Sequence, residues 1–227
     1  MPTISAYYSL IKPGLVYGNV LAMLGGFLLA SRTAVDWPLL AATLAGLSLV
    51  MAAACVANNY LDRDIDTLMA RTKNRVLAAG RLPSTRALLF SLVLLGTGVG
   101  ILQYGTNTLA LGMALFGFVA YVFAYTPLKR RSWYATHVGA LAGAVPPVVG
   151  YVAVTNSLDI GALVLFASMA LWQMPHFFAI AIRRKDDYAS AHIPVLPLVH
   201  GIRRTKLEML GYVAAFTLVS PTLTLIG

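Results

Sequence analysis

The chain has 227 residues, of which 59% are hydrophobic and 11% are charged, and its formal net charge is +9. A soluble domain carries about a quarter charged residues, so this composition excludes an ordinary water-soluble fold and indicates a protein that faces lipid. The basic residues flank apolar segments instead of covering a polar domain, which argues against nucleic acid as a partner. The one cysteine, Cys55, excludes an internal disulfide and a multi-cysteine metal cluster.

Seven apolar segments follow one another along the chain. Each is near the ~20 residues that cross a bilayer as a helix, and in lipid the backbone must hydrogen-bond within its own segment. The sequence therefore predicts an all-α, multi-pass transmembrane helical bundle. The predicted spans are residues 14–31, 38–57, 87–104, 107–126, 135–154, 160–182 and 207–227.

The basic residues are distributed asymmetrically between the two sides of these spans. Of the 17 Lys and Arg residues, all except Arg32 fall in the N-terminal segment or in the loops after spans two, four and six. The positive-inside rule predicts that these segments are cytoplasmic. Because the number of spans is odd, the C-terminus is expected on the far side, where the loops are short.

The second span ends in the run Asn58-Asn59-Tyr60-Leu61-Asp62-Arg63-Asp64-Ile65-Asp66. Asn58, Asp62 and Asp66 recur every four residues, so on a helix they share one face. Acidic residues at a membrane rim are costly and are commonly functional. We expect Asp62 and Asp66, with Asn58 beside them, to bind Mg²⁺, which takes carboxylate oxygens and bridges phosphates. The alternative, a solvated charge paired with basic neighbours, is the interpretation that we prefer for Asp64.

Basic residues near this run are suited to binding a diphosphate and to neutralising it as it departs. The alternative is that they only set the orientation in the membrane, and both uses can coexist. We expect Lys129 to contact the phosphate group, with the nearby aromatic ring of Tyr125 covering it. The candidates are Arg71, Lys73 and Arg75 after the second span, and Lys129 and Arg130 after the fourth.

The sixth span contains the stretch Trp172-Gln173-Met174-Pro175-His176-Phe177-Phe178. Pro175 predicts a kink, which can open a cavity between helices. His176 is a candidate iron ligand or proton-transfer group, with a core histidine as the alternative. The aromatic residues either pack in the core or shield a carbocation with their rings. Asp186 and Asp187 form a second acidic pair beyond this span, so we expect Asp187 to contribute to metal binding.

Together these motifs resemble the UbiA-type intramembrane prenyltransferases. The Asn58–Asp62–Asp66 pattern and the stretch Arg71-Thr72-Lys73-Asn74-Arg75 carry the general resemblance. Four further stretches occur in order, cover essentially the whole chain, and resemble the heme O synthase (protoheme IX farnesyltransferase) branch of that family. They are Tyr125–Arg131, Gly143–Pro147, Trp172–His176 and Asp187–Pro197.

The resemblance implies one transmembrane prenyltransferase domain over residues 1–227, in a bacterial cytoplasmic (inner) membrane, with a central cavity open to the cytoplasmic side. It implies that, with Mg²⁺, a farnesyl group is transferred from farnesyl diphosphate to a vinyl group of heme B. The products would be diphosphate and heme O for heme-copper terminal oxidases, so heme A synthase or oxidase assembly factors are implied partners. The implied pocket residues are Tyr125, Trp172, Gln173, His176 and Tyr188.

The chain departs from the pattern of the wider family in two ways. Ala191 stands four residues after Asp187, so the second Asp-x-x-x-Asp motif is incomplete, as in the heme-specific branch, and the composition of a second metal site stays open. The family usually has nine spans and this chain supports seven, so we expect that the last two family helices are missing here or that the chain is a fragment. The alternative functions are prenylation of a quinone-precursor aromatic acid, a non-catalytic role in oxidase assembly, and transport. Acids gathered at one rim argue against transport.

Overall fold

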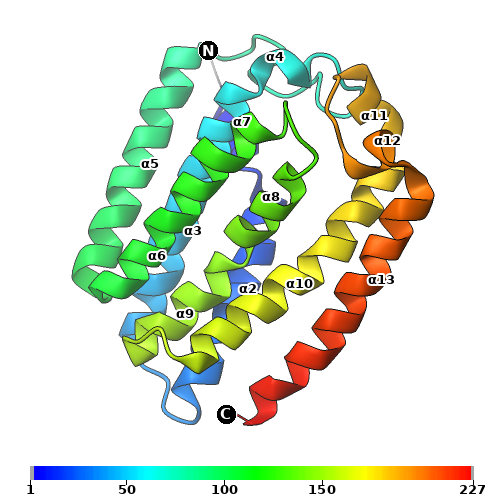
Figure 1. Ribbon diagram of the computed structural model, residues 1–227. Helices are drawn as coiled ribbons and strands as arrows, with labels where there is room; N and C mark the ends of the chain where they lie inside the picture. Colours follow the sequence, from blue (N-terminus) through cyan, green and yellow to red (C-terminus); the bar gives the residue numbers. More distant parts are fainter. Residues whose placement is uncertain (1–2, 226–227) are drawn as a thin grey trace.

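The computed structural model describes residues 3–225, which contain helices and connecting loops and no strand. Seven helical segments in this part of the chain are long and apolar enough to cross a membrane (Figure 1). The expected all-α multi-pass bundle is therefore confirmed. The last two residues of the predicted seventh span, 226 and 227, lie outside the described residues.

Long helices alternate with short helical pieces at the ends of the bundle. Six of the seven predicted spans agree with the structure to within a few residues. In chain order the helices are α1 (Ile4–Leu10), α2 (Pro13–Ser31), α3 (Trp37–Leu61), α4 (Arg63–Asp66), α5 (Ser84–Gly105), α6 (Thr108–Val119), η1 (Ala120–Tyr125), α7 (Thr126–Leu128), α8 (Ala135–Gly143), α9 (Val145–Thr155), α10 (Ile160–Arg183), α11 (Lys185–Ser190), α12 (Leu196–Val199), α13 (Gly201–Val219) and η2 (Ser220–Leu225).

The prediction for the seventh span was wrong at its start. Helix α13 begins at Gly201, six residues before the predicted position, so Arg203, Arg204 and Lys206 lie in its first turns and not in a loop. Arg204 forms an ion pair with Glu208 one turn further on, with 3.0 Å between Nη2 and Oε1. Charged residues spaced by one turn are compatible with a helix, because their side chains can meet on its surface.

Two of the seven spans are irregular where they pass through the bundle. The fifth is divided at Ala144 into α8 and α9, and Pro146 and Pro147 follow in the first turn of α9, where proline is well tolerated. The fourth contains η1, a π-helical turn of six residues, between α6 and α7. Single π-helical turns inside α-helices are frequent at functional sites. Both irregular segments face the interior cavity described below.

Helices α2 and α9 approach each other closely because glycines lie at their contact. A Cβ atom on Gly26 would lie 1.9 Å from the carbonyl oxygen of Pro147, and one on Gly150 would lie 2.1 Å from that of Met23. Small residues allow helix backbones in a membrane to come together without side chains between them. This contact helps to hold α2 in place as one wall of the site.

One end of the bundle carries most of its loops and short helices. Helices α4, α7, α11 and α12 lie there, at the top of Figure 1, next to the end of α3 and the end of α10. We call this end the polar end. The basic loops after spans two, four and six gather at it, whereas Arg32 follows α2 at the opposite end.

Candidate active site

The acidic residues of the second span lie at the polar end, where α3 passes into α4. The backbone N–H of Asp62 donates to Asn58 O at 2.9 Å, and that of Asp66 donates to Asp62 O at 2.8 Å. Helical spacing thus continues across the junction, and the three side chains follow one face. Asn58, Asp62 and Asp66 are 1–2% exposed, so both carboxylates are turned away from bulk solvent.

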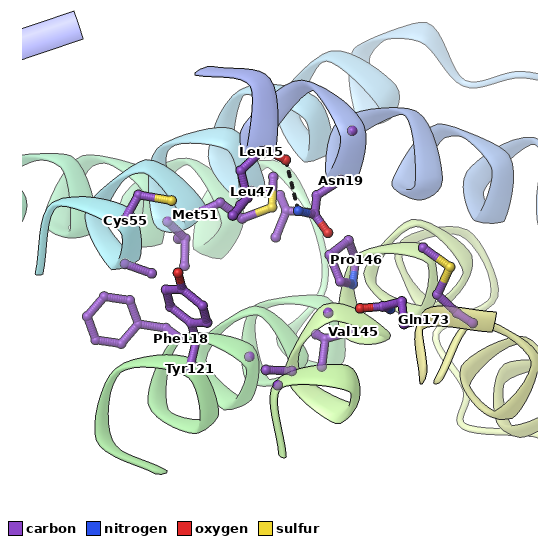
Figure 2. A pocket seen from close by; sticks show the side chains of 18 of the residues that line it. Leu15, Asn19, Leu47, Met51, Cys55, Phe118, Tyr121, Val145, Pro146 and Gln173 are labelled. Carbon is purple, nitrogen blue, oxygen red and sulfur yellow. Dashed lines mark hydrogen bonds between the residues drawn. The ribbon is translucent and has the colours of Figure 1, made fainter. Parts of the chain in front are cut away.

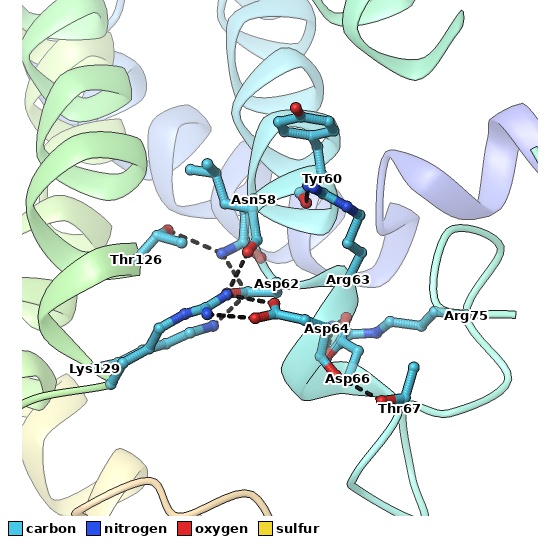
Figure 3. Close-up of polar contacts among 12 residues, drawn as sticks. Asn58, Tyr60, Asp62, Arg63, Asp64, Asp66, Thr67, Arg75, Thr126 and Lys129 are labelled. Carbon is cyan, nitrogen blue, oxygen red and sulfur yellow. Dashed lines mark hydrogen bonds and ion pairs between the residues drawn. The ribbon is translucent and has the colours of Figure 1, made fainter. Parts of the chain in front are cut away.

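Each of these carboxylates is paired with a basic residue (Figure 3). Lys129 Nζ donates to Asp62 Oδ2. Arg75 Nη1 donates to both oxygens of Asp66, at 3.0 and 2.8 Å. Removing one partner of a buried ion pair leaves an uncompensated charge, so each pair depends on both of its members.

Asp64 lies on the outside of this cluster, as expected from the sequence. Arg130 donates to both of its oxygens, each at 2.7 Å, and the Asp64 side chain is 63% exposed. The hydrogen bonds from Arg130 lower the pKa of Asp64 to about 2. An exposed pair of this kind contributes little to stability, about 0–1 kcal/mol.

Asn58 connects the carboxylates to two further residues. Its Nδ2 donates to Asp62 Oδ2 at 2.8 Å and to Thr126 Oγ1 at 2.9 Å, and its Oδ1 accepts from Lys12 Nζ. Thr126 Oγ1 in turn donates to Tyr121 O at 2.8 Å, so the π-helical turn sets its position.

Lys12 and Thr126 were not among the predicted site residues. Lys12 is the one basic residue before the first span, which could have drawn attention to it. Burial lowers its pKa to about 8, which reflects an amine held away from water. Thr126 carries no signal in the sequence spacing, because its contact with Asn58 depends on the π-helical turn.

The oxygen atoms of this cluster suit a hard divalent cation. Among the residues that the structure describes, Asp62 Oδ1 is buried without a hydrogen-bond partner, and Arg130 Nη2 is 3.9 Å away. An unpaired buried carboxylate oxygen is costly, and a cation at that position would satisfy it. Carboxylate oxygens are the ligands that Mg²⁺ prefers. Asp62 and Asp66 are the residues that would hold it.

The structure does not bring Asp187 together with these two acids. Within residues 3–225, no group of three or more His, Cys, Asp or Glu side chains lies close enough to hold a metal ion. Asp187 Oδ1 instead accepts from the backbone N–H of Ala70 at 3.1 Å, and Ser190 Oγ donates to Leu68 O at 2.9 Å. These bonds fasten α11 to the loop after α4.

The other predicted basic residues lie at the surface of the polar end. Arg71 and Lys73 have exposed side chains. Burial raises the pKa of Tyr188, and the nearby positive charges of Arg71 and Lys129 oppose that shift. Arg71 therefore acts electrostatically on the same region as Lys129, whereas the exposed Lys73 has the weakest structural support.

An apolar cavity of about 330 Å³ lies inside the bundle next to the charged cluster (Figure 2). Residues of α2, α3, α6, η1, α8, α9 and α10 line it, including the predicted Trp172, Gln173 and His176. Tyr125 is stacked on the lining residue Tyr121 at 5.3 Å between ring centroids, and Lys129 Nζ lies 5.6 Å from the centre of the Tyr125 ring. Tyr125 thus stands between the cavity and the charges.

Tyr188 does not line the cavity. It packs against Ile65, Met69 and Ala181 at the polar end, in a cluster with Ile193. It therefore lies near the cluster formed by Asn58, Asp62, Asp66 and their basic partners, which we call the charged head of the site. It does not lie beside the apolar residues among which it was predicted.

The charged cluster and the cavity are successive parts of the same helix faces. On α3, Leu47, Met51 and Cys55 line the cavity, and Asn58 and Asp62 continue the same stripe toward the polar end. Residues three or four apart share one face of a helix. A ligand with an anionic head and a long apolar tail would match this stripe along its whole length.

Gln173 places a polar group in this apolar cavity. It is 5% exposed, and its Nε2 has no hydrogen-bond partner among the described residues. A Cβ atom on Gly143 would lie 2.2 Å from Gln173 Oε1, so the glycine makes room for the amide. His176 is stacked on Trp172, with 5.5 Å between ring centroids. The amide and the imidazole are polar groups that an apolar ligand with polar substituents could use.

Residues 19–227 match the UbiA prenyltransferase family. The chain belongs to this family. The family resemblance carried by the Asn58–Asp62–Asp66 pattern is thereby confirmed.

Curated relatives narrow the comparison to one branch of the UbiA family. A protein of Serratia proteamaculans is 50% identical over 99% of this chain and 76% of its own length. One of Protochlamydia amoebophila is 50% identical over 97% of this chain and 78% of its own. Both are named protoheme IX farnesyltransferase, so the more specific resemblance to that branch is confirmed as well.

Solved structures of UbiA-type enzymes share the fold. A digeranylgeranylglyceryl phosphate synthase superposes with a TM-score of 0.81 at 18% identity, over 100% of this chain and 79% of its own. A UbiA homolog of Archaeoglobus fulgidus bound to GPP and Mg²⁺ gives 0.80 at 16% identity, over 98% and 78%. At these identities the likeness establishes the helical architecture.

Proposed function

We propose that this prenyltransferase transfers the farnesyl group of farnesyl diphosphate to a vinyl group of heme B, giving heme O and diphosphate. The observation that carries the proposal is the 50% identity, over 99% of the chain, to a protein named protoheme IX farnesyltransferase. The site supports it physically, because a charged head suits the diphosphate and an apolar cavity suits the isoprenoid chain.

The proposed reaction forms one carbon–carbon bond and consumes one water molecule. The bond between farnesyl C1 and oxygen breaks, and diphosphate leaves with the electron pair. Farnesyl C1 bonds to the outer vinyl carbon, and the positive charge left on the inner carbon takes the oxygen of water, which then loses a proton. The substituent formed is the hydroxyethylfarnesyl group of heme O.

The charged head would bind and orient the diphosphate. We infer that Asp62 and Asp66 hold Mg²⁺, which when bound would draw electron density from the diphosphate and ease cleavage of the carbon–oxygen bond. Lys129 and Arg75 already lie on these carboxylates and could turn to the phosphate oxygens when the cation arrives. The position of Asp187 on Ala70 N does not favour it as a third ligand.

The cavity would hold the apolar chain and exclude water from the allylic centre. Phe118, Tyr121 and Trp172 line it, and the faces of aromatic rings stabilise nearby positive charge. Gln173 and His176 are the polar groups that we assign to the porphyrin, with His176 as the candidate iron ligand. Water would then reach the reacting carbons only after the carbon–carbon bond has formed, which limits hydrolysis of the diphosphate substrate.

We infer that the protein lies in a bacterial inner membrane with its N-terminus in the cytoplasm. The gathering of basic loops at the polar end supports this orientation. Farnesyl diphosphate would then reach the charged head from the cytoplasmic side. Heme O is too apolar to diffuse freely through water, so transfer to heme A synthase or to a terminal oxidase under assembly is expected to take place within the bilayer.

A direct assay tests the proposed reaction. The purified chain in detergent is incubated with heme B, farnesyl diphosphate and Mg²⁺, and the heme is analysed by chromatography with mass detection. We expect heme O. Absence of heme O together with efficient prenylation of a hydroxybenzoate would contradict the proposal and favour a quinone precursor as the acceptor.

A further inference from the structure

Lys12 reaches the charged head through the amide of Asn58 and not through a carboxylate. It links α1 and α2 in a left-handed backbone conformation, with φ 50° and ψ 64°. A residue other than glycine rarely adopts this conformation, which persists only where the surroundings impose it. Here it coincides with a side chain whose Nζ donates to Asn58 Oδ1, across the Asn58 amide from Asp62.

The charges at the head of the site do not cancel. Lys12, Arg75 and Lys129 carry three positive charges, and Asp62 and Asp66 carry two negative ones, whereas Arg130 and Asp64 neutralise each other at the surface. A cluster held away from water with an excess of positive charge favours an anion. One divalent cation raises the excess to about three charges, which a diphosphate ester of about three negative charges balances.

A second metal ion would lack both ligands and charge balance. Enzymes that act on phosphate groups often use two metal ions to clamp the attacking and leaving oxygens. In the part of the chain that the structure describes, Asp64 is paired with Arg130 at the surface, Asp187 accepts from Ala70 N, and no group of three acids is formed. Position 191, one turn beyond Asp187, is an alanine and offers no carboxylate.

We propose that the site binds its diphosphate with one divalent cation, and that the Lys12 ammonium group supplies the positive charge that a second metal ion would supply. This inference rests on the proposed function for the identity of the diphosphate substrate. Asn58 serves as the intermediary, because its amide holds Lys12 on one side and Asp62 on the other. When the diphosphate binds, the ammonium group can pass from the amide oxygen to a phosphate oxygen, where its hydrogen bond is stronger.

Binding of Mn²⁺, used as a substitute for Mg²⁺, tests the metal count. Free Mn²⁺ is measured by electron paramagnetic resonance while the detergent-purified chain is titrated in the presence of inorganic diphosphate. We expect one Mn²⁺ per chain. Two Mn²⁺ per chain would overturn the proposal.

Lys12→Gln tests the role of the charge, since it keeps a hydrogen-bond donor for Asn58 and removes the ammonium group. We expect the affinity for diphosphate in the presence of Mn²⁺ to fall about 10- to 100-fold. The affinity for Mn²⁺ alone should stay the same or rise, because one positive charge near the carboxylates is gone. A purely structural role would weaken both kinds of binding, and unchanged diphosphate affinity would equally contradict the proposal.

Two further variants control this comparison. Lys12→Arg keeps the charge and should bind diphosphate within a few-fold of the parent chain. Arg63→Gln removes an exposed charge that lies over the Tyr60 ring, 4.4 Å from its centre, and should change neither affinity. If Lys12→Gln does not fold, the number of bound Mn²⁺ ions still tests whether one cation is used. The Lys12→Arg variant still tests whether a positive charge at this position is sufficient for diphosphate binding.

Failure of this inference is distinguishable from failure of the proposed reaction. Diphosphate binding with one Mn²⁺ but no heme O would mean that the acceptor is wrong and the role of Lys12 stands. Heme O formation with two bound Mn²⁺ ions would mean that the proposed reaction is right and that the one-metal inference is wrong.

Discussion

Asp62 combines nearly complete burial with an oxygen atom that has no hydrogen-bond partner in the described chain. Its other oxygen accepts from Lys129 and Asn58. We predict that Asp62→Asn lowers turnover by about 100-fold or more, because the amide cannot ligate the cation as a carboxylate does. Heme O formation measured by chromatography, with Mn²⁺ binding measured in parallel, checks this prediction.

Two controls separate a lost metal ligand from a lost fold. Asp62→Asn leaves Lys129 without its buried partner, which costs about 3–5 kcal/mol of stability, so thermal unfolding of the variant must be recorded alongside. Asp64→Asn removes an acid from the same run whose side chain is mostly exposed, and it should keep turnover within about three-fold. Equal losses in both variants would contradict the assignment of Asp62.

Replacing Gln173 is expected to affect binding without lowering stability, unlike the replacement of Asp62. Its Nε2 lacks a partner, so an apolar side chain of similar size removes an unsatisfied buried group. We predict that Gln173→Leu has an unfolding temperature equal to or above that of the parent chain, while its affinity for heme B falls. Thermal unfolding and an absorbance titration with heme measure the two effects. Unchanged heme affinity would contradict the assignment of Gln173 to the porphyrin and would leave it with a packing role only.

Helix α3 shows what a regular element allows sequence analysis to predict. The four-residue spacing of Asn58, Asp62 and Asp66 predicted a shared face, and the backbone bonds across the α3–α4 junction preserve that spacing. Local spacing is sufficient here because a helix fixes the relative direction of side chains that lie close together along the chain. The pairing of Asp62 with Lys129, 67 residues away, requires the packing of the whole bundle.

Irregular elements account for what the sequence did not predict. The π-helical turn η1 directs Thr126 toward Asn58, and the left-handed conformation of Lys12 directs its side chain to the same amide. Neither follows from hydrophobic periodicity, because each is a local departure from regular helix geometry imposed by tertiary contacts. The early start of α13 was missed because three basic residues were interpreted as a loop.

The contact between α2 and α9 provides a test at the level of helix packing. A Cβ atom on Gly26 would lie 1.9 Å from Pro147 O, whereas for its neighbour Gly25 no described atom outside its own helix lies within 4 Å. We predict that Gly26→Val destabilises the protein by about 1–3 kcal/mol or more, because the helices must move apart. Gly25→Val should be close to neutral. Thermal unfolding in detergent compares them, and equal effects would contradict the packing argument.

The orientation of the whole molecule can be tested by labelling with a thiol reagent that does not cross membranes. The native Cys55 is 1% exposed and should not react, so the parent chain serves as a blank. In spheroplasts we predict labelling of Leu158→Cys, at the end opposite to the polar end, and labelling of Arg131→Cys only after lysis. The reverse pattern would contradict a cytoplasmic polar end.

The number of spans and their approximate limits could be predicted because apolar runs of about 20 residues have few alternative structures in a bilayer. The same composition says little about the cavity. Its volume of about 330 Å³ depends on how five long segments pack, on the absence of a side chain at Gly143, and on the division of the fifth span at Ala144. Those features exist only in the assembled bundle.

The pairing of the buried acids with basic residues of the chain also affects how the protein matures. Asp62 and Asp66 have Lys129 and Arg75 as counterions from the outset, so folding need not wait for a cation from the cytoplasm. Small zinc domains behave differently, since they unfold when a chelator removes their metal. Treatment with EDTA should therefore abolish turnover while the protein stays folded, with the unfolding temperature falling only by the stabilisation that the bound cation contributes. Re-addition of Mg²⁺ should restore activity without a refolding step.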